Sequence, residues 1–525
     1  MDTKALRQKI LDLAIRGKLV PQDPNDEPAS VLLQRIRAEK QQMVKDGKLK
    51  AKEIKNDTVI FLGDDNLHYE KFPDGTVKCI EDEIPFELPE GWRWDRLGNV
   101  SIIARGGSPR PIESYITDDE NGINWIKIGD TEKDGKYIFK TKEKIKPEGL
   151  SKSRYVESGD FLLTNSMSFG RPYILRTDGC IHDGWLVIGN IDTVFNQDFL
   201  YYALSSYFMY QTLSLLAAGS TVKNLKSDTV KSVLFPIPPM REQKRIAEKI
   251  DSLISFVIKI ESDKTDLQTT IQLTKSKILD LAIRGKLVPQ DPNDEPASVL
   301  LERIRTEKEE LIKQGKIKRD KKESVIFRGD DNSYYEKIGD TVTCIDEELP
   351  FELPDGWIWC RGSSCFLTME SRKPSGTYFK YIDIDSIDNK HQAIKEAKIT
   401  ETAKAPSRAN RAVFDGSILF SLVRPYLKNI ALVDSNNADS IASTGFYIAT
   451  SNGTFIPKYL YILMISAYVV NGLNQFMKGD NSPSISKDNI EKWLYPVPPL
   501  AEQEKIADIV QKYIRILEDI EKSLS

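Results

Sequence analysis

Apolar residues between Met240 and about Gly285 recur at alternating steps of four and three residues, interrupted only at Lys264 and Thr274. This spacing keeps one face of a long α-helix apolar and is typical of a coiled-coil seam. The Pro238–Pro239 pair in front of it should end a strand and start the helix. A second seam of the same spacing precedes the C-terminus. The seam positions are Ile246, Ile250, Leu253, Val257, Ile260, Leu267, Ile271, Ile278 and Leu281 in the first copy, and Ile506, Val510, Tyr513, Leu517, Ile520 and Leu524 in the second.

The sequence also contains an internal duplication. Residues Lys9–Leu33 recur without a change as Lys277–Leu301, and similarity returns around Trp92 and Trp357 and again after each Pro-Pro pair. Aligning the two copies places Ser525 opposite residue 265 and Met1 opposite residue 269. We therefore expect the two chain ends to rebuild one central helix, in a circular repeat of two equivalent halves. Dimerisation or simple core packing is the alternative explanation of the seam.

Between the shared segments lie two private ones without mutual similarity, from about Arg96 to Leu234 and from about Arg361 to Leu494. Both mix short β-branched and aromatic runs with Gly, Pro, Asn and Asp breaks, which predicts compact domains of strands and helices. Each ends in an apolar stretch, 201–218 or 459–476, that suits a helix packed on the sheet. The predicted fold class is α+β, with two pseudo-two-fold-related α/β domains separated by long antiparallel coiled-coil helices. Together with the motifs at their borders, the two private domains are predicted to span 86–239 and 351–499. The shared segments are then 1–85, 240–350 and 500–525.

Composition narrows the classes of protein. At 525 residues the chain should form two or more domains, and no apolar run approaches the ~20 residues of a membrane span. The charged N-terminus is unlike a signal peptide, and five scattered cysteines provide no disulfide framework, so a cytoplasmic location is expected. Cys360 and Cys365 are interpreted as packing residues, because no second Cys or His pair lies at metal-ligand spacing.

The duplicated segment Leu13–Gln22, the twin motifs ELPEGW and ELPDGW, and the boundaries PIPPMREQKRIAEKID and PVPPLAEQEKIADIV carry a family resemblance. With them the whole chain resembles the specificity subunits of type I restriction-modification systems. The resemblance implies that the private segments are two target recognition domains, each recognising one half of a split double-stranded DNA target. It also implies that the shared helices dock two methyltransferase subunits and, through them, restriction and translocase subunits.

The resemblance further implies that S-adenosylmethionine, ATP and Mg²⁺ belong to the partner subunits, with no cofactor, metal or catalytic residue on this chain. The sequence has no Asn/Asp-Pro-Pro-aromatic methyltransferase motif and no Gly-Lys pair followed by Ser or Thr, as a phosphate-binding loop requires. Its three histidines, His68, His182 and His391, are scattered singly and indicate solvated or packed side chains. A nuclease function of this chain is not supported, because its sequence shows no convincing carboxylate cluster.

Side chains that recognise bases must be polar, long enough to reach a groove, and carried by loops or helix ends. Three loops qualify in each private segment. The candidates in the first are Arg105, Ser108 and Arg110, then Asn165, Ser166, Ser168 and Arg171, then Ser220, Thr221, Lys223 and Asn224; those in the second are Ser371, Arg372, Lys373 and Ser375, then Arg424, Tyr426 and Lys428, then Asn481, Ser482 and Ser484. A solvated turn is the alternative for each, and Tyr426 could instead be a core aromatic.

Charge and function leave two further questions. Lys and Arg against Asp and Glu number 16 and 16 over residues 101–235, and 15 and 12 over 366–495, so weak DNA binding by the chain alone is expected. The charged stretches 35–55 and 303–323 are predicted to be solvated helices, or else methyltransferase docking sites. A bivalent scaffold, whose two private domains bind proteins, explains the architecture equally well. Interchangeable recognition domains on one common framework fit the unlike private segments better.

Overall fold

The computed structural model describes residues 2–132, 135–165, 169–189, 191–217, 224–317 and 324–524. The chain divides into two compact units, unit 1 (Met1–Asp263) and unit 2 (Lys264–Ser525). The boundary falls inside helix α8 (Met240–Ile283), which begins directly after Pro239 and ends two residues before Gly285. The long helix expected from the heptad spacing is therefore confirmed. Among the described residues, no helix is long and apolar enough to cross a membrane.

Unit 1 carries two five-stranded sheets and a separate three-stranded sheet. The sheets have the orders β5-β14-β11-β12-β8, β10-β13-β7-β9-β6 and β1-β2-β3, and β4 pairs with β15. The strands are β1 (Val59–Leu62), β2 (His68–Lys71), β3 (Val77–Cys79), β4 (Arg93–Arg96), β5 (Ile102–Arg105), β6 (Ile116–Thr117), β7 (Ile123–Ile126), β8 (Tyr137–Ile138), β9 (Glu143–Ile145), β10 (Arg154–Val156), β11 (Phe161–Thr164), β12 (Pro172–Leu175), β13 (Gly179–Ile181), β14 (Trp185–Gly189) and β15 (Leu234–Ile237). The helices are α1 (Thr3–Ile15), α2 (Ala29–Lys45), α3 (Ala51–Ile54), α4 (Leu97–Val100), α5 (Gln197–Leu204), α6 (Tyr207–Leu216), α7 (Ser227–Lys231) and the first part of α8.

Unit 2 repeats this plan with shorter sheets. Their orders are β23-β20-β27-β24, β26-β25-β28, β21-β22 and β16-β17-β18, and β19 pairs with β29. The strands are β16 (Ser324–Arg328), β17 (Tyr334–Ile338), β18 (Thr341–Cys344), β19 (Ile358–Arg361), β20 (Tyr378–Ile382), β21 (Ile387–Asp388), β22 (Ala393–Ile394), β23 (Lys398–Glu401), β24 (Ala409–Ala412), β25 (Ile418–Ser421), β26 (Ile430–Leu432), β27 (Ile441–Ser443), β28 (Phe446–Ala449) and β29 (Leu494–Val497). The helices are the rest of α8, α9 (Ala297–Lys313), α10 (Gly362–Cys365), α11 (Pro457–Ile465), α12 (Ala467–Asn474), α13 (Lys487–Lys492) and α14 (Leu500–Ser523).

The prediction of a single helix at the end of each private segment is wrong, because each stretch forms two short helices. In unit 1 the break lies at Ser206, whose hydroxyl accepts a hydrogen bond from the Met209 amide at 3.2 Å. In unit 2 it lies at Ser466, whose hydroxyl accepts from the Val469 amide at 3.3 Å. An N-capping serine satisfies an amide that would otherwise lack a partner, so a new helix starts there at low cost.

A buried Glu-Gln pair at the start of each long helix joins the shared motifs. Glu242 accepts hydrogen bonds from the Trp92 indole at 3.0 Å and from Gln22 at 3.1 Å. Gln243 donates to the Val194 carbonyl at 2.9 Å and accepts from the Asn196 amide at 2.8 Å. The ELPEGW and PPMREQ motifs therefore recur together because the tryptophan of one binds the glutamate of the other.

Unit 2 makes the same contacts with its own residues. Trp357 donates to Glu502 at 2.8 Å, and Gln503 donates to the Thr454 carbonyl at 3.0 Å and accepts from the Ile456 amide at 2.9 Å. The shared residues thus hold two unlike private segments on equivalent helix starts.

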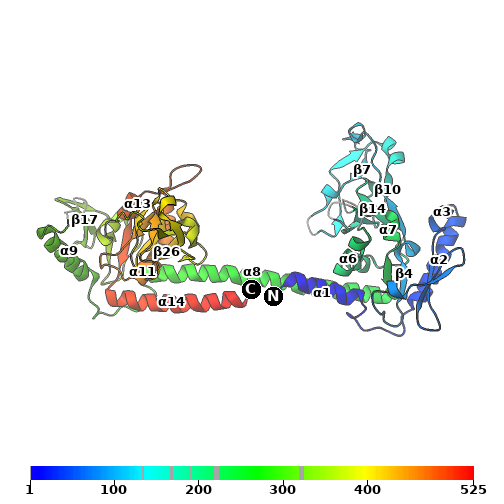
Figure 1. Ribbon diagram of the computed structural model, residues 1–525, viewed down its shortest axis with the longest axis horizontal. Coiled ribbons are helices and arrows are strands. Elements are labelled where there is room, and N and C mark those ends of the chain that lie inside the picture. Colours follow the sequence, from blue (N-terminus) through cyan, green and yellow to red (C-terminus); the bar gives the residue numbers. More distant parts are fainter. Residues whose placement is uncertain are drawn as a thin grey trace. The chain divides into compact units, whose positions relative to one another are not determined.

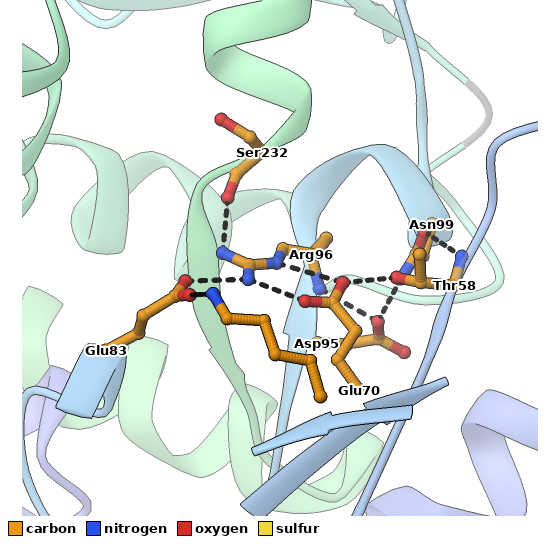
Figure 2. A network of polar contacts seen from close by, with 8 residues as sticks. Thr58, Glu70, Glu83, Asp95, Arg96, Asn99 and Ser232 are labelled. Carbon is orange, nitrogen blue, oxygen red and sulfur yellow. Dashed lines mark hydrogen bonds and ion pairs between the residues drawn. The ribbon is translucent and has the colours of Figure 1, made fainter. Parts of the chain in front are cut away.

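An arginine at the end of β4 ties the three-stranded sheet to the rest of unit 1 (Figure 2). Arg96 lies 2.7 Å from Glu70 and 2.8 Å from Glu83, and donates to the Ser232 carbonyl at 2.9 Å. Burial alone would raise the pKa of Glu70, but hydrogen bonds from Arg96 and Thr58 outweigh it and hold the pKa below its usual value. In unit 2, Arg361 makes the equivalent contacts to Glu336, Glu348 and the Lys492 carbonyl.

The predicted seam residues separate into two groups. Ile246, Ile250, Val257, Ile271, Ile506 and Val510 are buried, and all of these except Ile271 belong to the main hydrophobic cores of the units. Ile260, Leu267, Tyr513 and Ile520 are exposed, and Leu253, Ile278, Leu281, Leu517 and Leu524 are partly buried. The first turns after each Pro-Pro pair therefore pack on a globular domain, which the heptad spacing alone did not distinguish from a helix–helix contact.

Beyond those turns, each unit pairs two helices. α1 lies along α8 in unit 1 (Figure 1), with an ion pair between Arg7 and Glu261 at 2.5 Å. In unit 2 the repeat-equivalent residues Lys275 and Glu521, on α8 and α14, form an ion pair at 2.9 Å.

Candidate nucleic-acid interface

In unit 1 the turn between β13 and β14 gathers several predicted DNA-contact residues. The Asp183 carbonyl accepts hydrogen bonds from Arg105 Nε at 3.0 Å and from Asn165 Nδ2 at 2.7 Å. The Asp183 carboxylate accepts from the Ser108 hydroxyl at 2.9 Å and lies 3.4 Å from Arg110 Nη2. Two loops that are distant in sequence are thereby fixed beside one turn.

The Gly106–Gly107 pair is required by this packing. A Cβ on Gly106 would lie 2.1 Å from the His182 carbonyl oxygen, and one on Gly107 would lie 2.9 Å from the Lys152 carbonyl oxygen. Glycines in such a loop can let the backbone approach a ligand closely. In the structure the close approach is to the protein's own backbone.

The electrostatics leave Arg110 available to a phosphate. Its side chain is 81% exposed and that of Asp183 is 42% exposed, and such a solvated ion pair contributes only about 0–1 kcal/mol. Burial acts to raise the pKa of Asp183, but the Ser108 hydroxyl and neighbouring His182 outweigh it, so the pKa lies below its usual value. Burial also lowers the pKa of His182, which favours the neutral ring.

The remaining candidates of unit 1 are only partly placed. Ser166, Ser168, Ser220, Thr221 and Lys223 lie outside the described residues. The Arg171 guanidinium lies 5.4 Å from the centre of the Tyr173 ring. Asn224 is exposed, and the next residue, Leu225, donates its amide to the Asn165 carbonyl at 2.8 Å. That bond brings the third loop to the second.

Unit 2 joins its second and third loops by the same backbone bonds, although the residues differ. Leu422 donates to the Gly445 carbonyl at 2.8 Å and accepts from the Ile485 amide at 2.9 Å. In unit 1, Asn165 donates to the Gly184 carbonyl at 3.0 Å and accepts from Leu225. The two private segments therefore present loops at equivalent places on one framework.

The second loop of unit 2 has a constrained backbone. Arg424 and Lys428 adopt φ angles of 48° and 53°, in the left-handed region that costs most residues about 1–2 kcal/mol. Arg424 Nη2 donates to the Asn481 carbonyl at 2.7 Å, which links this loop to the third. Between the two strained residues, Pro425 is buried while Tyr426 and Leu427 are 47% and 40% exposed. Tyr426 is therefore not a core aromatic.

The first loop of unit 2 is placed by β24. Ser371 forms a bridge with Arg411, and the Arg372 amide donates to the Asn410 carbonyl at 3.3 Å. Lys373 and Ser375 are exposed. In the third loop Ser482 is exposed, and Ser484 exchanges two backbone bonds with Lys478, each of 3.0 Å.

Sequence reasoning missed three residues at these loops. Asp183 organises the first cluster, Arg154 donates to the Arg105 carbonyl at 3.2 Å, and Leu427 is exposed beside Tyr426. No sequence signal marks Asp183 or Arg154, because their contacts join segments far apart in the chain. Leu427 could have been found as an apolar residue inside a Pro-containing turn.

Comparison with known proteins agrees with this architecture. The family model described as type I restriction modification DNA specificity domain matches residues 89–268 and 364–525. The specificity subunits of the type I restriction enzymes EcoAI and EcoEI of Escherichia coli are each 28% identical to the chain. The alignments cover 98% and 99% of this chain, and 89% and 90% of those proteins.

A solved structure of similar fold is described as the structural basis underlying complex assembly and conformational transition of the type I R-M system. It has a TM-score of 0.55 and 18% identity, and the match covers 84% of this chain and 94% of that one. The family model covers well over half of the chain, in two matches that each include most of one private segment. The chain therefore belongs to the family of specificity subunits of type I restriction-modification systems.

Proposed function

We propose that the two private domains each recognise one half of a bipartite double-stranded DNA target through the three loops described above. The observation that carries this is the equivalent backbone pairing of Asn165 and Leu422, which holds unlike polar loops at one place on a shared framework. Exposed arginines and an exposed Tyr426–Leu427 turn are suited to phosphate contact and base contact.

The chain acts in the cytoplasm as a non-catalytic part of a larger enzyme. The shared segments, in a circular repeat with antiparallel coiled-coil helices, set the spacing between the domains and dock two methyltransferase subunits. Restriction and translocase subunits join through these. Adenine methylation with S-adenosylmethionine, and cleavage with ATP and Mg²⁺, are carried out by the partners. The equivalent Arg7–Glu261 and Lys275–Glu521 ion pairs support equivalent helix pairs in the two units.

The test is to co-express the chain with its methyltransferase subunit in a host without adenine methylation and to map modified adenines genome-wide. We expect a split motif that disappears when this chain is omitted. Tyr426→Ala should relax or abolish recognition in one half of the motif and leave the other half unchanged. Lys404→Ala, an exposed lysine outside the three loops of the same domain, is the matched control.

A bivalent protein-binding scaffold is the competing function. It predicts a stable complex with no methylation at all, and no effect of loop substitutions on any DNA motif. A domain swap separates the two functions: one private segment is replaced by a recognition domain of known target. Methylation at that target is expected for a DNA-specificity subunit and no methylation for a scaffold.

A further inference from the structure

Among the residues that the structure describes, the three-stranded sheets β1-β2-β3 and β16-β17-β18 each pack one face against the core of their own unit. In unit 1, Ile60 and Ile80 of this region pack with Trp94 and Leu234. In unit 2, Ile326 and Ile345 pack with Trp359 and Leu494. Side chains alternate between the two faces of a strand, so the intervening positions point away from these clusters.

The strand register defines the outer face of each sheet. In unit 1 it consists of the cross-strand rows Phe61-Tyr69-Cys79 and Val59-Lys71-Val77. In unit 2 it consists of the rows Phe327-Tyr335-Cys344 and Val325-Lys337-Val342. The rings of Phe61 and Tyr69 stack at 5.9 Å, as do those of Phe327 and Tyr335. We call these two sets the outer sheet faces.

The outer sheet faces are identical at all six positions and partly exposed to the same extent. Phe61 and Phe327 are 40% and 38% exposed, and Val77 and Val342 are 52% and 51% exposed. Isolated exposed apolar residues need no explanation, but contiguous aromatic and aliphatic ones mark interaction sites.

On the opposite faces of the same strands, the exposed and partly exposed positions have diverged, while the buried ones have not. Leu62 is replaced by Arg328, His68 by Tyr334 and Lys78 by Thr343, while Ile60 and Glu70 keep their counterparts Ile326 and Glu336. Exposed and partly exposed positions of the opposite face have thus changed, whereas all six positions of the outer face are unchanged. Internal packing alone gives no reason for that difference, whereas a common ligand on both outer sheet faces does.

The charge around these faces favours a protein ligand over DNA. Acidic residues lie at both ends of each sheet, in the turns that hold Asp65 and Asp74 in unit 1 and Asp331 and Asp340 in unit 2. Hydrogen bonds from Tyr69 and the Leu67 amide lower the pKa of Asp65, and those from Tyr335 and the Ser333 amide lower the pKa of Asp331. The carboxylates of Asp65 and Asp331 are therefore ionised at neutral pH and would repel phosphates.

We propose that each outer sheet face docks one copy of the same protein subunit. The contact surface of that subunit is expected to be apolar and bordered by basic residues, which complement the acidic turns of this chain. Resting on the function proposed above, we identify this subunit as the methyltransferase. The chain has two such faces, one in each unit, and the function proposed above involves two methyltransferase copies. The docking is thereby assigned to particular residues of the shared segments, and each copy has its own face.

The experiment is native mass spectrometry of the full chain mixed with purified methyltransferase subunit. Wild type should bind two copies. Phe61→Lys and Phe327→Lys should each leave one copy bound, with affinity at the altered face roughly tenfold or more weaker, and the double variant should bind none. Leu62→Lys is the matched control, because Leu62 is 48% exposed on the same strand but on the opposite face.

Val77→Lys and Val342→Lys repeat the test on the second row, in case a phenylalanine substitution impairs folding. Circular dichroism and thermal unfolding should match wild type for every variant compared. If the folded double variant still binds two copies with unchanged affinity, the inference is wrong while the proposed function stands. If wild type binds no methyltransferase, the proposed function fails and the inference fails with it.

Discussion

Replacing Arg96 by methionine removes the guanidinium that joins β4 to Glu70, Glu83 and the Ser232 carbonyl (Figure 2). Glu70, whose side chain is only 5% exposed, would remain buried with the Thr58 hydroxyl as its remaining donor, at 2.6 Å. Removing one partner of a buried ion pair costs about 3–5 kcal/mol. Glu83 is 34% exposed, so its lost contact adds at most about 1 kcal/mol. We expect the free energy of unfolding of unit 1 to fall by about 3–5 kcal/mol at pH 7.

The contribution of Glu70 to the pH dependence of stability should change sign in the Arg96→Met variant. In wild type the pKa of folded Glu70 is lowered, so the stabilisation is fully present above the unfolded pKa and is lost as the pH falls through the folded pKa. Without Arg96, burial should raise the folded pKa above the unfolded value. The folded variant then binds more protons, and its stability increases as the pH falls from 7 through that raised pKa. The deficit against wild type should therefore narrow on acidification.

The assay is urea unfolding at pH 7 and pH 5, with hydrogen exchange of β1–β4 amides to localise the effect. Arg361→Met should produce a similar loss in unit 2, because the Glu336 side chain is only 9% exposed. In a Glu70→Gln background the Arg96→Met substitution should cost less, since no buried charge is left unpaired. A loss below about 1 kcal/mol, or a deficit that widens at pH 5, would refute the reasoning.

Three further predictions follow from the interface. Gly106→Ala should destabilise unit 1 by about 1–3 kcal/mol in denaturant unfolding, because its Cβ would meet the His182 carbonyl; Gly129→Ala, with nothing within 4 Å, should be near neutral, and equal effects would contradict the packing argument. Lys428→Val should cost about 1–2 kcal/mol because a β-branched residue resists a φ of 53°, whereas Lys428→Gly should stay within about 1 kcal/mol of wild type; unfolding curves that rank them the other way would show that the turn is unstrained. The isolated chain should bind its DNA target only weakly at physiological salt and more tightly with methyltransferase present, since neither private segment is strongly basic. A nanomolar dissociation constant for the chain alone, measured by fluorescence anisotropy, would contradict this.

Local and repeated features of the sequence determined much of this protein. The Pro-Pro pairs and the heptad spacing predicted where α8 begins and ends, because helix starts and apolar periodicity are properties of neighbouring residues. The internal repeat and the boundary motifs predicted the shared and private segments and the family. The candidate DNA-contact loops were predicted from their polar composition and their place in each half, and remain a prediction.

Only the tertiary structure decided which distant residues meet. Asp183 gathers Arg105, Ser108 and Asn165 across long sequence separations, and no local pattern encodes that contact. The same holds for the Trp92–Glu242 hydrogen bond, which explains why two motifs recur together. Strand register placed six identical residues on one exposed face of each small sheet, because a shift of one residue would have reversed every side chain.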